Sequence, residues 1–378
     1  MLTDGRKLRL MATVTPLASI FGSGFLIIVP VLERSLGALS IVGAVAVCAL
    51  AWFVGTAVRH LVREVEPLQA SGELDRTSRW LEKASDIVIV VAYVISVALY
   101  LRIMAQYVVS FAGSESATAE RLLASVAVAV IVVVGVTRGF GGLDKMERVA
   151  LAAVILLTAV LGVALLVEDS LLVARGTFEL PPVPATGLLD VLLVLGGVVI
   201  TVQGFETIRY LGGEYDAQTR ISASRIAQVV ATAIYVGLVA LSTPLMGIGT
   251  DAGVDRNLIS ITDRVAPLLA IPLVLGAVLS QFSAATADTV AAGGNLGGLR
   301  RSLSGAPAYV LSGVAAVILL WTVGTLEIIA VASRAFAAYY ALQSVIAVRT
   351  SEGVWRKAGF AALAVVLGLI TLFARPAG

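Results

Sequence analysis

The sequence of 378 residues has very few of the residues that build disulfides and metal sites, with one cysteine and one histidine. Cys48 has no second cysteine to pair with, so an internal disulfide and a thiolate metal cluster are both excluded. His60 alone likewise excludes a histidine cluster. Charged residues are scarce as well, at 14%, where a soluble domain carries about 25%. We therefore expect no metal, no cofactor and no nucleic-acid partner.

Hydrophobic residues, in contrast, make up 58% of the chain, and the mean hydropathy is +0.97. Roughly 20 apolar residues span the hydrocarbon core of a bilayer, and runs of about this length recur along the whole sequence. The chain is therefore predicted to be an all-α membrane protein. Its expected transmembrane helices, about eleven by this measure, lie at 11–32, 38–58, 86–111, 122–137, 149–167, 187–211, 224–247, 265–292, 308–323, 326–348 and 356–374.

The polar connections between these runs are short, so no soluble domain is expected. The charged segment 59–85 is predicted to form a short helix on the membrane surface. Most lysines and arginines outside the runs fall on the side of the N-terminus, which the positive-inside rule places in the cytoplasm, with the C-terminus outside. We expect an integral protein of the lipid bilayer, in a bacterial inner (plasma) membrane.

Weak helix formers interrupt the first run, which contains "IFGSGFLIIVPVL" with Gly22, Ser23 and Gly24 at its centre. Glycine costs about 1 kcal/mol relative to alanine inside a helix, so the three residues together predict a discontinuity. Within a bilayer, a break is permitted only where protein or a water-filled cavity satisfies the freed backbone groups. We predict that residues 20–25 are not helical.

A second interruption is expected in "VVITVQGFETIRYLGGEY", where Gln203, Gly204 and Glu206 break an apolar run with groups that are expensive next to lipid. The two interrupted helices are five spans apart, which gives two five-helix units opposite orientations in the membrane. We predict that residues 202–206 are not helical and face the first break near the midplane. Either break alone is explained equally well by glycines that let two helices pack closely.

The stretches "GSGFLIIVP" and "QGFE" resemble motifs of the amino acid/polyamine/organocation (APC) transporter superfamily. The resemblance implies a leucine-transporter-type fold, formed by a single transmembrane transporter domain over 1–378. In that fold, 11–167 and 187–348 are inverted five-helix repeats with discontinuous first helices, and 356–374 is a peripheral eleventh helix. The superfamily's amino acid permeases usually have twelve spans, which is one more than the number expected here.

The resemblance also implies a substrate site at the two breaks. Backbone amides of the first break would bind a substrate carboxylate, and Phe205 would form a gate or wall. Tyr93, in the span 86–111, is a further candidate for the substrate site, because tyrosines recur there at helical spacing. Tyrosines in such a pattern also serve packing. The predicted substrate-binding residues are Gly22, Ser23, Gly24, Tyr93, Gly204, Phe205 and Glu206.

Ion coupling is expected in the run 265–292, which contains "LSQFSAATADTVAAGGNL". Ser283 and Thr286 share one helix face, and in sodium-coupled members of the fold such hydroxyls bind the ion with carbonyls of the first helix. Alternatively, they hydrogen-bond to their own backbone. Asp288 and Glu206 are ionisable groups within spans and are candidates for proton coupling. Arg209 is the alternative, as a structural partner of either carboxylate.

Arg102 and Arg334 also lie within predicted spans, at similar depth. They either attract an anionic substrate or form structural pairs with Asp190 or Glu327, and the sequence leaves both interpretations open.

The sequence predicts a secondary active transporter for an amino acid or similar small organic solute, working by alternating access with H+ or Na+ coupling. An enzyme is not expected, because the chain has no Gly-x-Ser-x-Gly motif, no histidine deep in a span and no metal-ligand spacing. The alternatives are an inorganic cation transporter or channel on the same fold, and a sensor that binds a small molecule without moving it.

Overall fold

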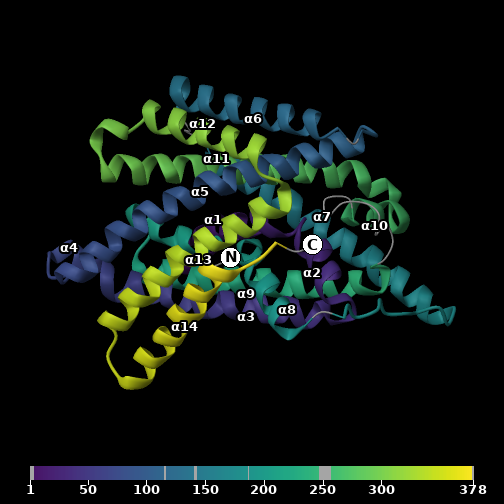
Figure 1. The fold of residues 1–378 in the computed structure, drawn as a ribbon, viewed down its shortest axis with the longest axis horizontal. Coiled ribbons are helices and arrows are strands. Elements are labelled where there is room, and N and C mark those ends of the chain that lie inside the picture. Colours follow the sequence, from purple (N-terminus) through teal and green to yellow (C-terminus); the bar gives the residue numbers. More distant parts are fainter. Residues whose placement is uncertain (1–3, 115, 140–142, 186, 247–256, 377–378) are drawn as a thin grey trace.

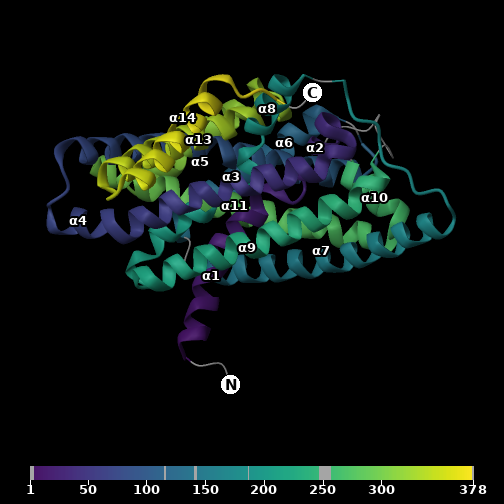
Figure 2. The same cartoon turned by 90° about the horizontal axis from the view of Figure 1, so that it is seen from below.

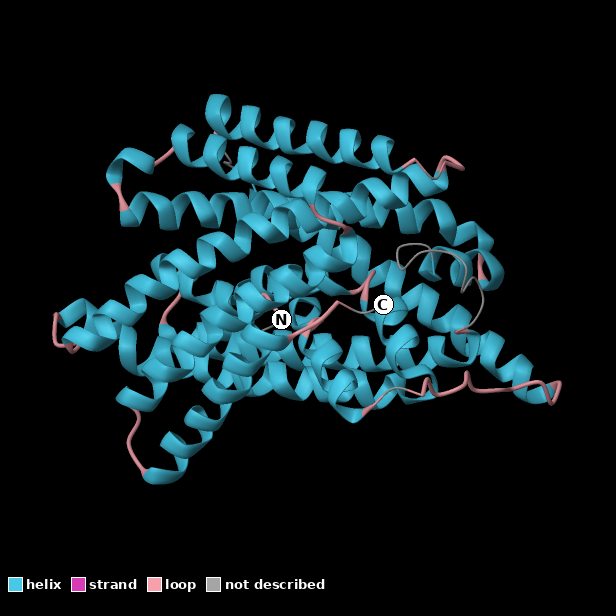
Figure 3. Ribbon diagram, viewed as in Figure 1, coloured by secondary structure: helices cyan, strands magenta, loops and turns pink. Residues whose placement is uncertain are grey.

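The computed structural model describes residues 4–114, 116–139, 143–185, 187–246 and 257–376. All regular secondary structure in these ranges is helical, and the helices are joined by short loops (Figure 3). The α-helices are α1 (Asp4–Gly24), α2 (Ile28–Leu36), α3 (Ser40–His60), α4 (Glu66–Ser71), α5 (Arg76–Phe111), α6 (Ala117–Arg138), α7 (Leu143–Ala174), α8 (Leu188–Gly196), α9 (Ala217–Ser242), α10 (Asn257–Val265), α11 (Ala270–Leu299), α12 (Ala306–Thr322), α13 (Thr325–Thr350) and α14 (Val354–Phe373).

Shorter helical segments connect or interrupt these helices. A π-helical stretch, η2 (Leu61–Val65), joins α3 to α4. The 3-10 helices are η1 (Gly37–Leu39), η3 (Val199–Val202), η4 (Phe205–Gly213), η5 (Thr243–Leu245), η6 (Pro267–Leu269) and η7 (Arg301–Leu303). The helix α4 lies in the charged segment 59–85, as the sequence predicts.

Eight helical stretches of the described chain are long and apolar enough to cross a membrane, and α12 is apolar but shorter. Each predicted run from 38–58 onward coincides with a helix or a series of helices. The prediction of an all-α membrane protein is therefore confirmed. The number of eleven spans and the inverted repeat remain predictions.

Three helices form the centre of the bundle, because α5 packs along both α11 and α13. Figure 1 shows α5 and α11 crossing the molecule side by side, with α6 and α12 along one edge. The most apolar window of α5 is 78% buried within the protein, whereas that of α14 is 11% buried. Most of the surface of the last helix is therefore free to face lipid.

The first helix takes an unusual course. Its C-terminal half packs against α7, α9, α11 and η4, whereas its N-terminal turns project away from the other helices (Figure 2). Pro16 lies inside α1, between the exposed N-terminal turns and the buried half. Proline removes one hydrogen bond of the helix ladder, so this position is suited to a change of direction.

The long helices α5 and α9 begin at an aspartate, as expected for strong N-caps. Asp75 accepts hydrogen bonds from the backbone amides of Thr77 and Ser78 at 3.0 and 3.2 Å. Asp216 accepts one from Thr219 at 2.9 Å. These caps fix where the two helices leave the polar loops and enter the bundle.

Candidate functional site

The first predicted break exists, but it lies later in the chain than expected. The helix α1 continues through Gly22 to Gly24, residues 25–27 form a turn, and α2 starts at Ile28. The turn is closed by a hydrogen bond from the Ile27 amide to the Gly24 carbonyl, at 3.0 Å. The prediction that residues 20–25 are not helical is therefore wrong for 20–24. The Ser23 side chain lies outside the described part of the structure.

The second break extends over a longer stretch. After α8 ends at Gly196, the chain forms η3, leaves helical geometry at Gln203 and Gly204, and resumes as η4. Gly204 has φ of +129°, a backbone conformation that L-residues rarely adopt. Within the predicted segment 202–206, only residues 203 and 204 lie outside helical turns.

The two breaks are in direct contact, and glycine makes this contact possible. A Cβ atom on Gly24 would lie 1.7 Å from the carbonyl oxygen of Thr201, and one on Gly204 would lie 2.6 Å from the backbone nitrogen of Ile20. Gly22 approaches α11 in the same way, since its Cβ would lie 2.6 Å from that of Ala284. In this conformation the glycines serve close packing of backbones.

Side chains from other helices engage the carbonyls around the first break. The Tyr235 hydroxyl donates to the Ile20 carbonyl at 2.7 Å, and the Gln281 amide donates to the Gly22 carbonyl at 2.8 Å. Thr286 bonds back to the carbonyl of Phe282 at 2.7 Å. The Gly22 carbonyl thus accepts a hydrogen bond from the Gln281 side chain of α11. A sodium site between the first helix and the run 265–292 would instead place a cation next to such a carbonyl.

Glu206 closes the second break from within. One of its carboxylate oxygens accepts hydrogen bonds from the Gly204 amide at 3.0 Å and from the Tyr340 hydroxyl at 2.6 Å. The ring of Phe205 stacks on Tyr340 with centroids 5.4 Å apart. Glu206 and Phe205 are both 1% exposed, so they are buried inside the protein next to α13.

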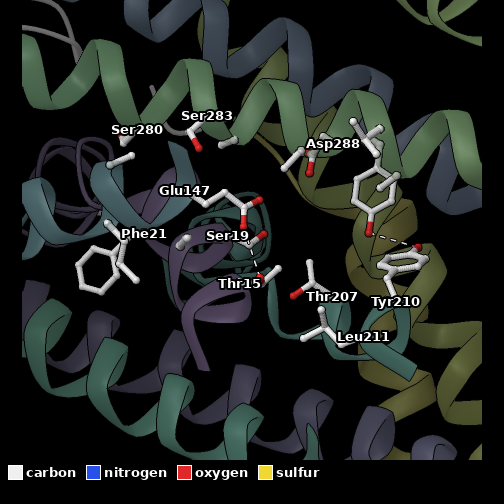
Figure 4. A pocket seen from close by; sticks show the side chains of 18 of the residues that line it. Thr15, Ser19, Phe21, Glu147, Thr207, Tyr210, Leu211, Ser280, Ser283 and Asp288 are labelled. Carbon is white, nitrogen blue, oxygen red and sulfur yellow. Dashed lines mark hydrogen bonds between the residues drawn. The ribbon is translucent and has the colours of Figure 1, made fainter. Parts of the chain in front are cut away.

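The main cavity beside the breaks has a volume of about 490 Å³ and lies between α1, α5, α7, η4 and α11 (Figure 4). Of the predicted site residues, it brings together Tyr93, Ser283 and Asp288. The others, Gly22, Gly24, Gly204, Phe205, Glu206 and Thr286, are not part of its lining. Ser280, from the same polar stretch of α11, also lines the cavity. The sequence did not predict the remaining polar residues of the wall, which are Thr15, Ser19, Glu147, Thr207, Tyr210 and Asn295.

Two carboxylates dominate the chemistry of this cavity. Asp288 is 4% exposed and hydrogen-bonded to the Ser96 hydroxyl, and Glu147 is 6% exposed and accepts from the Thr15 hydroxyl at 3.3 Å. Figure 4 shows both carboxyl groups directed into the cavity from α11 and α7. Asp288 therefore faces the interior of the protein and not the lipid. No lysine, arginine or histidine is among the described residues that line the cavity.

An aromatic pair forms one wall. The Tyr93 hydroxyl donates to that of Tyr210 at 3.3 Å, and Asn295 donates to the same oxygen at 3.1 Å. Tyr210 of η4 thus links α5 and α11 at the cavity. A tyrosine wall with its hydroxyls already hydrogen-bonded offers apolar ring surface to a ligand.

Arg209 takes part in a separate network of charges. It pairs with Glu82 at 3.1 Å and Glu66 at 3.8 Å, and Arg220 pairs with Glu66 at 2.6 Å. Gln343 accepts a further hydrogen bond from Arg209 at 2.6 Å. The network joins η4 to α4, α5, α9 and α13.

This network corrects one expectation. Arg209 is not the partner of Glu206, which bonds to Tyr340, or of Asp288, which bonds to Ser96. Glu206 and Asp288 thus each accept a hydrogen bond from a neutral hydroxyl group. Arg209 instead neutralises carboxylates at the start of α5 and in α4.

The sequence leaves the roles of Arg102 and Arg334 open. In the structure, both have partners other than Asp190 and Glu327. Arg102 lies 3.7 Å from Glu120 and donates to the Leu320 carbonyl at 3.0 Å. Arg334 donates to carbonyls at the end of α14. Asp190 pairs with Arg375 at 3.2 Å. The suggested pairs with Asp190 or Glu327 are therefore wrong.

Comparisons with known proteins agree with this geometry. The chain resembles an uncharacterized protein of Aquifex aeolicus (strain VF5), with 34% identity over 352 residues, 90% of this chain and 84% of the relative. Its fold resembles that of MHP1, a nucleobase-cation-symport-1 family transporter in a closed conformation with bromovinylhydantoin bound. The TM-score is 0.56, at 13% identity, and the match covers 97% of this chain and 91% of that one. The sequence model of a family described as APC superfamily transporter matches residues 5–374, so the chain belongs to the APC superfamily of transporters.

Proposed function

We propose that this chain is a secondary transporter for an amino acid or a similar small organic solute that carries a positively charged amino group. Membership of a transporter superfamily supports transport. The charge of the cavity supports the substrate class, because Glu147 and Asp288 line it without any described cationic side chain. An ammonium group would offset the cost of holding two carboxylates away from bulk water.

The size of the cavity supports an organic solute over a bare ion. Its volume of about 490 Å³ falls within the ~300–1,000 Å³ typical of small-molecule sites. The inorganic cation alternative depends on free carbonyls at the breaks, and those of Ile20 and Gly22 accept hydrogen bonds from Tyr235 and Gln281. This occupation also favours a proton over sodium as the coupling ion.

Asp288 is the proposed proton carrier. Its hydrogen-bond partner is the Ser96 hydroxyl, which can donate to a carboxylate or accept from a carboxylic acid. Both protonation states of Asp288 can therefore be satisfied without rearrangement of α5. With two acidic groups in one cavity, one can hold the ammonium group while the other holds a proton.

Uptake into proteoliposomes tests this proposal. Labelled amino acids, polyamines and inorganic cations are offered with an imposed pH gradient, and then with sodium replaced by potassium. We expect uptake of an amine-bearing solute that follows the pH gradient and does not require sodium. Uptake confined to inorganic cations would instead establish the ion transporter, and binding without uptake would establish the sensor.

Two variants separate the roles of the carboxylates. Asp288→Asn should abolish stimulation by the pH gradient while solute exchange continues, and Glu147→Gln should weaken solute binding. Glu179→Gln, in an exposed loop, is the matched control and should behave like the parent. Unchanged pH dependence in Asp288→Asn would remove this residue from coupling.

The orientation and the repeat architecture are part of the same proposal. We propose an N-terminus in the cytoplasm of a bacterial cell, an outside C-terminus and two inverted repeats over 11–167 and 187–348. The charge distribution of the sequence and the contact between the two breaks support this arrangement. Protease accessibility of tags at the two ends, in inside-out and right-side-out vesicles, tests the orientation.

A further inference from the structure

A second cavity, separate from the one beside the breaks, opens as a groove between α3, α8 and α14. Its volume is about 860 Å³. Its wall is apolar except for two arginines, which are Arg334 of α13 and Arg375 directly after α14. The apolar part is lined by leucines and other aliphatic side chains, including Leu50, Leu192 and Leu369.

Arg334 is the unusual member of this groove. Its Nε and Nη2 atoms donate to the carbonyls of Thr371 and Leu372 at 2.7 and 3.0 Å, which caps the C-terminal end of α14. No carboxylate of the described residues forms an ion pair with it. The guanidinium is exposed, although α13 is apolar enough to span a membrane. Its charge is therefore not neutralised by the described part of the protein.

Arg375 adds to this positive charge. Its side chain pairs with Asp190 at 3.2 Å, and both side chains are more than half exposed. Two guanidinium groups and one carboxylate thus lie at the rim of the groove, with a net positive charge. A positive charge next to hydrocarbon is costly unless an anion lies beside it.

We propose that this groove binds one anionic phospholipid. The phosphate would lie between Arg334 and Arg375, where a guanidinium offers paired N–H donors to phosphate oxygens. An acyl chain would lie along the leucines of α3, α8 and α14. A phospholipid supplies the anion and the apolar chain in one molecule, and it is present wherever a helix bundle faces the bilayer.

The position of the groove gives the lipid a place beside the second break. Gly196, the last residue of α8, lines the groove. At the next residue, a Cβ atom on Gly197 would lie 2.0 Å from the Arg375 carbonyl oxygen, so the chain after α14 packs directly on the break. A lipid in this groove therefore contacts α8 and the segment that supports its end.

Native mass spectrometry of the purified protein tests the proposal, with phosphatidylglycerol and phosphatidylcholine of identical acyl chains as probes. We expect preferential retention of phosphatidylglycerol by the parent protein. The double variant Arg334→Gln with Arg375→Gln should bind it about tenfold more weakly, since charge-assisted hydrogen bonds to phosphate are lost. Arg175→Gln, an exposed arginine at the end of α7, is the control and should bind like the parent.

A second variant keeps both charges and fills the groove. Leu369→Trp adds bulk at a position that is 52% exposed, and should also weaken phosphatidylglycerol binding without unfolding the protein. Inorganic phosphate should not displace the lipid. Equal binding of the two lipids, unchanged binding in both Leu369→Trp and the double arginine variant, or displacement by phosphate alone would overturn the proposal.

Discussion

The two interrupted helices of this transporter are stabilised in different ways. At the first, residues 25–27 separate two α-helices, and the nearby carbonyls are engaged by Tyr235 and Gln281 from other helices. At the second, the Gly204 amide is engaged by Glu206 of the same segment. One break is thus held by neutral side chains of its neighbours, and the other by its own ionisable group. Among the described contacts of the two breaks, a change of protonation acts directly on the second break, through Glu206.

The largest expected effect comes from removing the close contact between the breaks. Gly204→Ala and Gly24→Ala each place a Cβ atom against backbone, and at Gly204 the positive φ adds strain. We expect each to lower the free energy of unfolding by about 3 kcal/mol or more. Thermal unfolding in detergent measures this, with ligand binding recorded on the fraction that remains folded.

Gly237→Ala on α9 is the control, because no atom lies within 4 Å of the added Cβ. It should be neutral or stabilising by up to about 1 kcal/mol. If Gly204→Ala and Gly237→Ala melt alike, the backbones of the two breaks do not touch in solution. Leucine at Gly24 or Gly204 would meet the same backbone atoms, so the contacts predict that it also unfolds the protein.

A smaller effect on the free energy of unfolding is expected from two tyrosine substitutions, one at each break. Tyr340→Phe removes a hydrogen bond to the Glu206 carboxylate, and Tyr235→Phe removes one to the Ile20 carbonyl. Hydrogen bonds to charged groups contribute about 1.5–3 kcal/mol and neutral ones about 0.5–1.5 kcal/mol. We therefore expect Tyr340→Phe to destabilise the protein more, by unfolding measurements at neutral pH.

The same comparison in the Glu206→Gln background isolates the charge. There the two tyrosine substitutions should cost similar amounts, since both hydrogen bonds are then neutral. A difference that persists in Glu206→Gln would mean that packing of the Tyr340 ring, and not the carboxylate, distinguishes the breaks.

The smallest expected effect lies away from both breaks, at the cap of α5. Hydrogen bonds from Ser78 and Arg349 lower the pKa of Asp75 below its usual value of 3.8. A lowered pKa in the folded state means that the stabilisation is present above the unfolded pKa and is lost as the pH falls through the folded one. Asp75→Asn should therefore lower the melting temperature slightly at pH 7, and the difference should shrink in strong acid. A difference that grows on acidification would contradict this.

The helices were predictable because long apolar runs have few alternatives to a membrane span. The position of the first break was not predictable from the sequence. A glycine such as Gly22 or Gly24 either interrupts a helix or allows a neighbouring helix to pack closely, and these two roles look alike in sequence. Both residues remain in helix here, and they admit the neighbouring α11 and η3 at close range. Only the coordinates of the partner helices distinguish a packing glycine from a break.

The candidate site was predictable in part. Asp288 and Ser283 were found because they are polar residues inside a long apolar run. Glu147 was missed because "LDKMERVA" resembles the charged flank of a span. A signal was present, since Glu147, Ala150, Leu151 and Val154 follow helical spacing, and all line the cavity.

The charge network around Arg209 also bears on the order in which the protein assembles. Glu82 and Arg209 are 127 residues apart, so Glu82 is synthesised long before its partner. A carboxylate without a counterion resists transfer out of water. We therefore expect the first turns of α5 to complete their packing only after η4 brings Arg209. In that order of assembly, the docking of η4 is a late step that completes the packing of the earlier half of the chain.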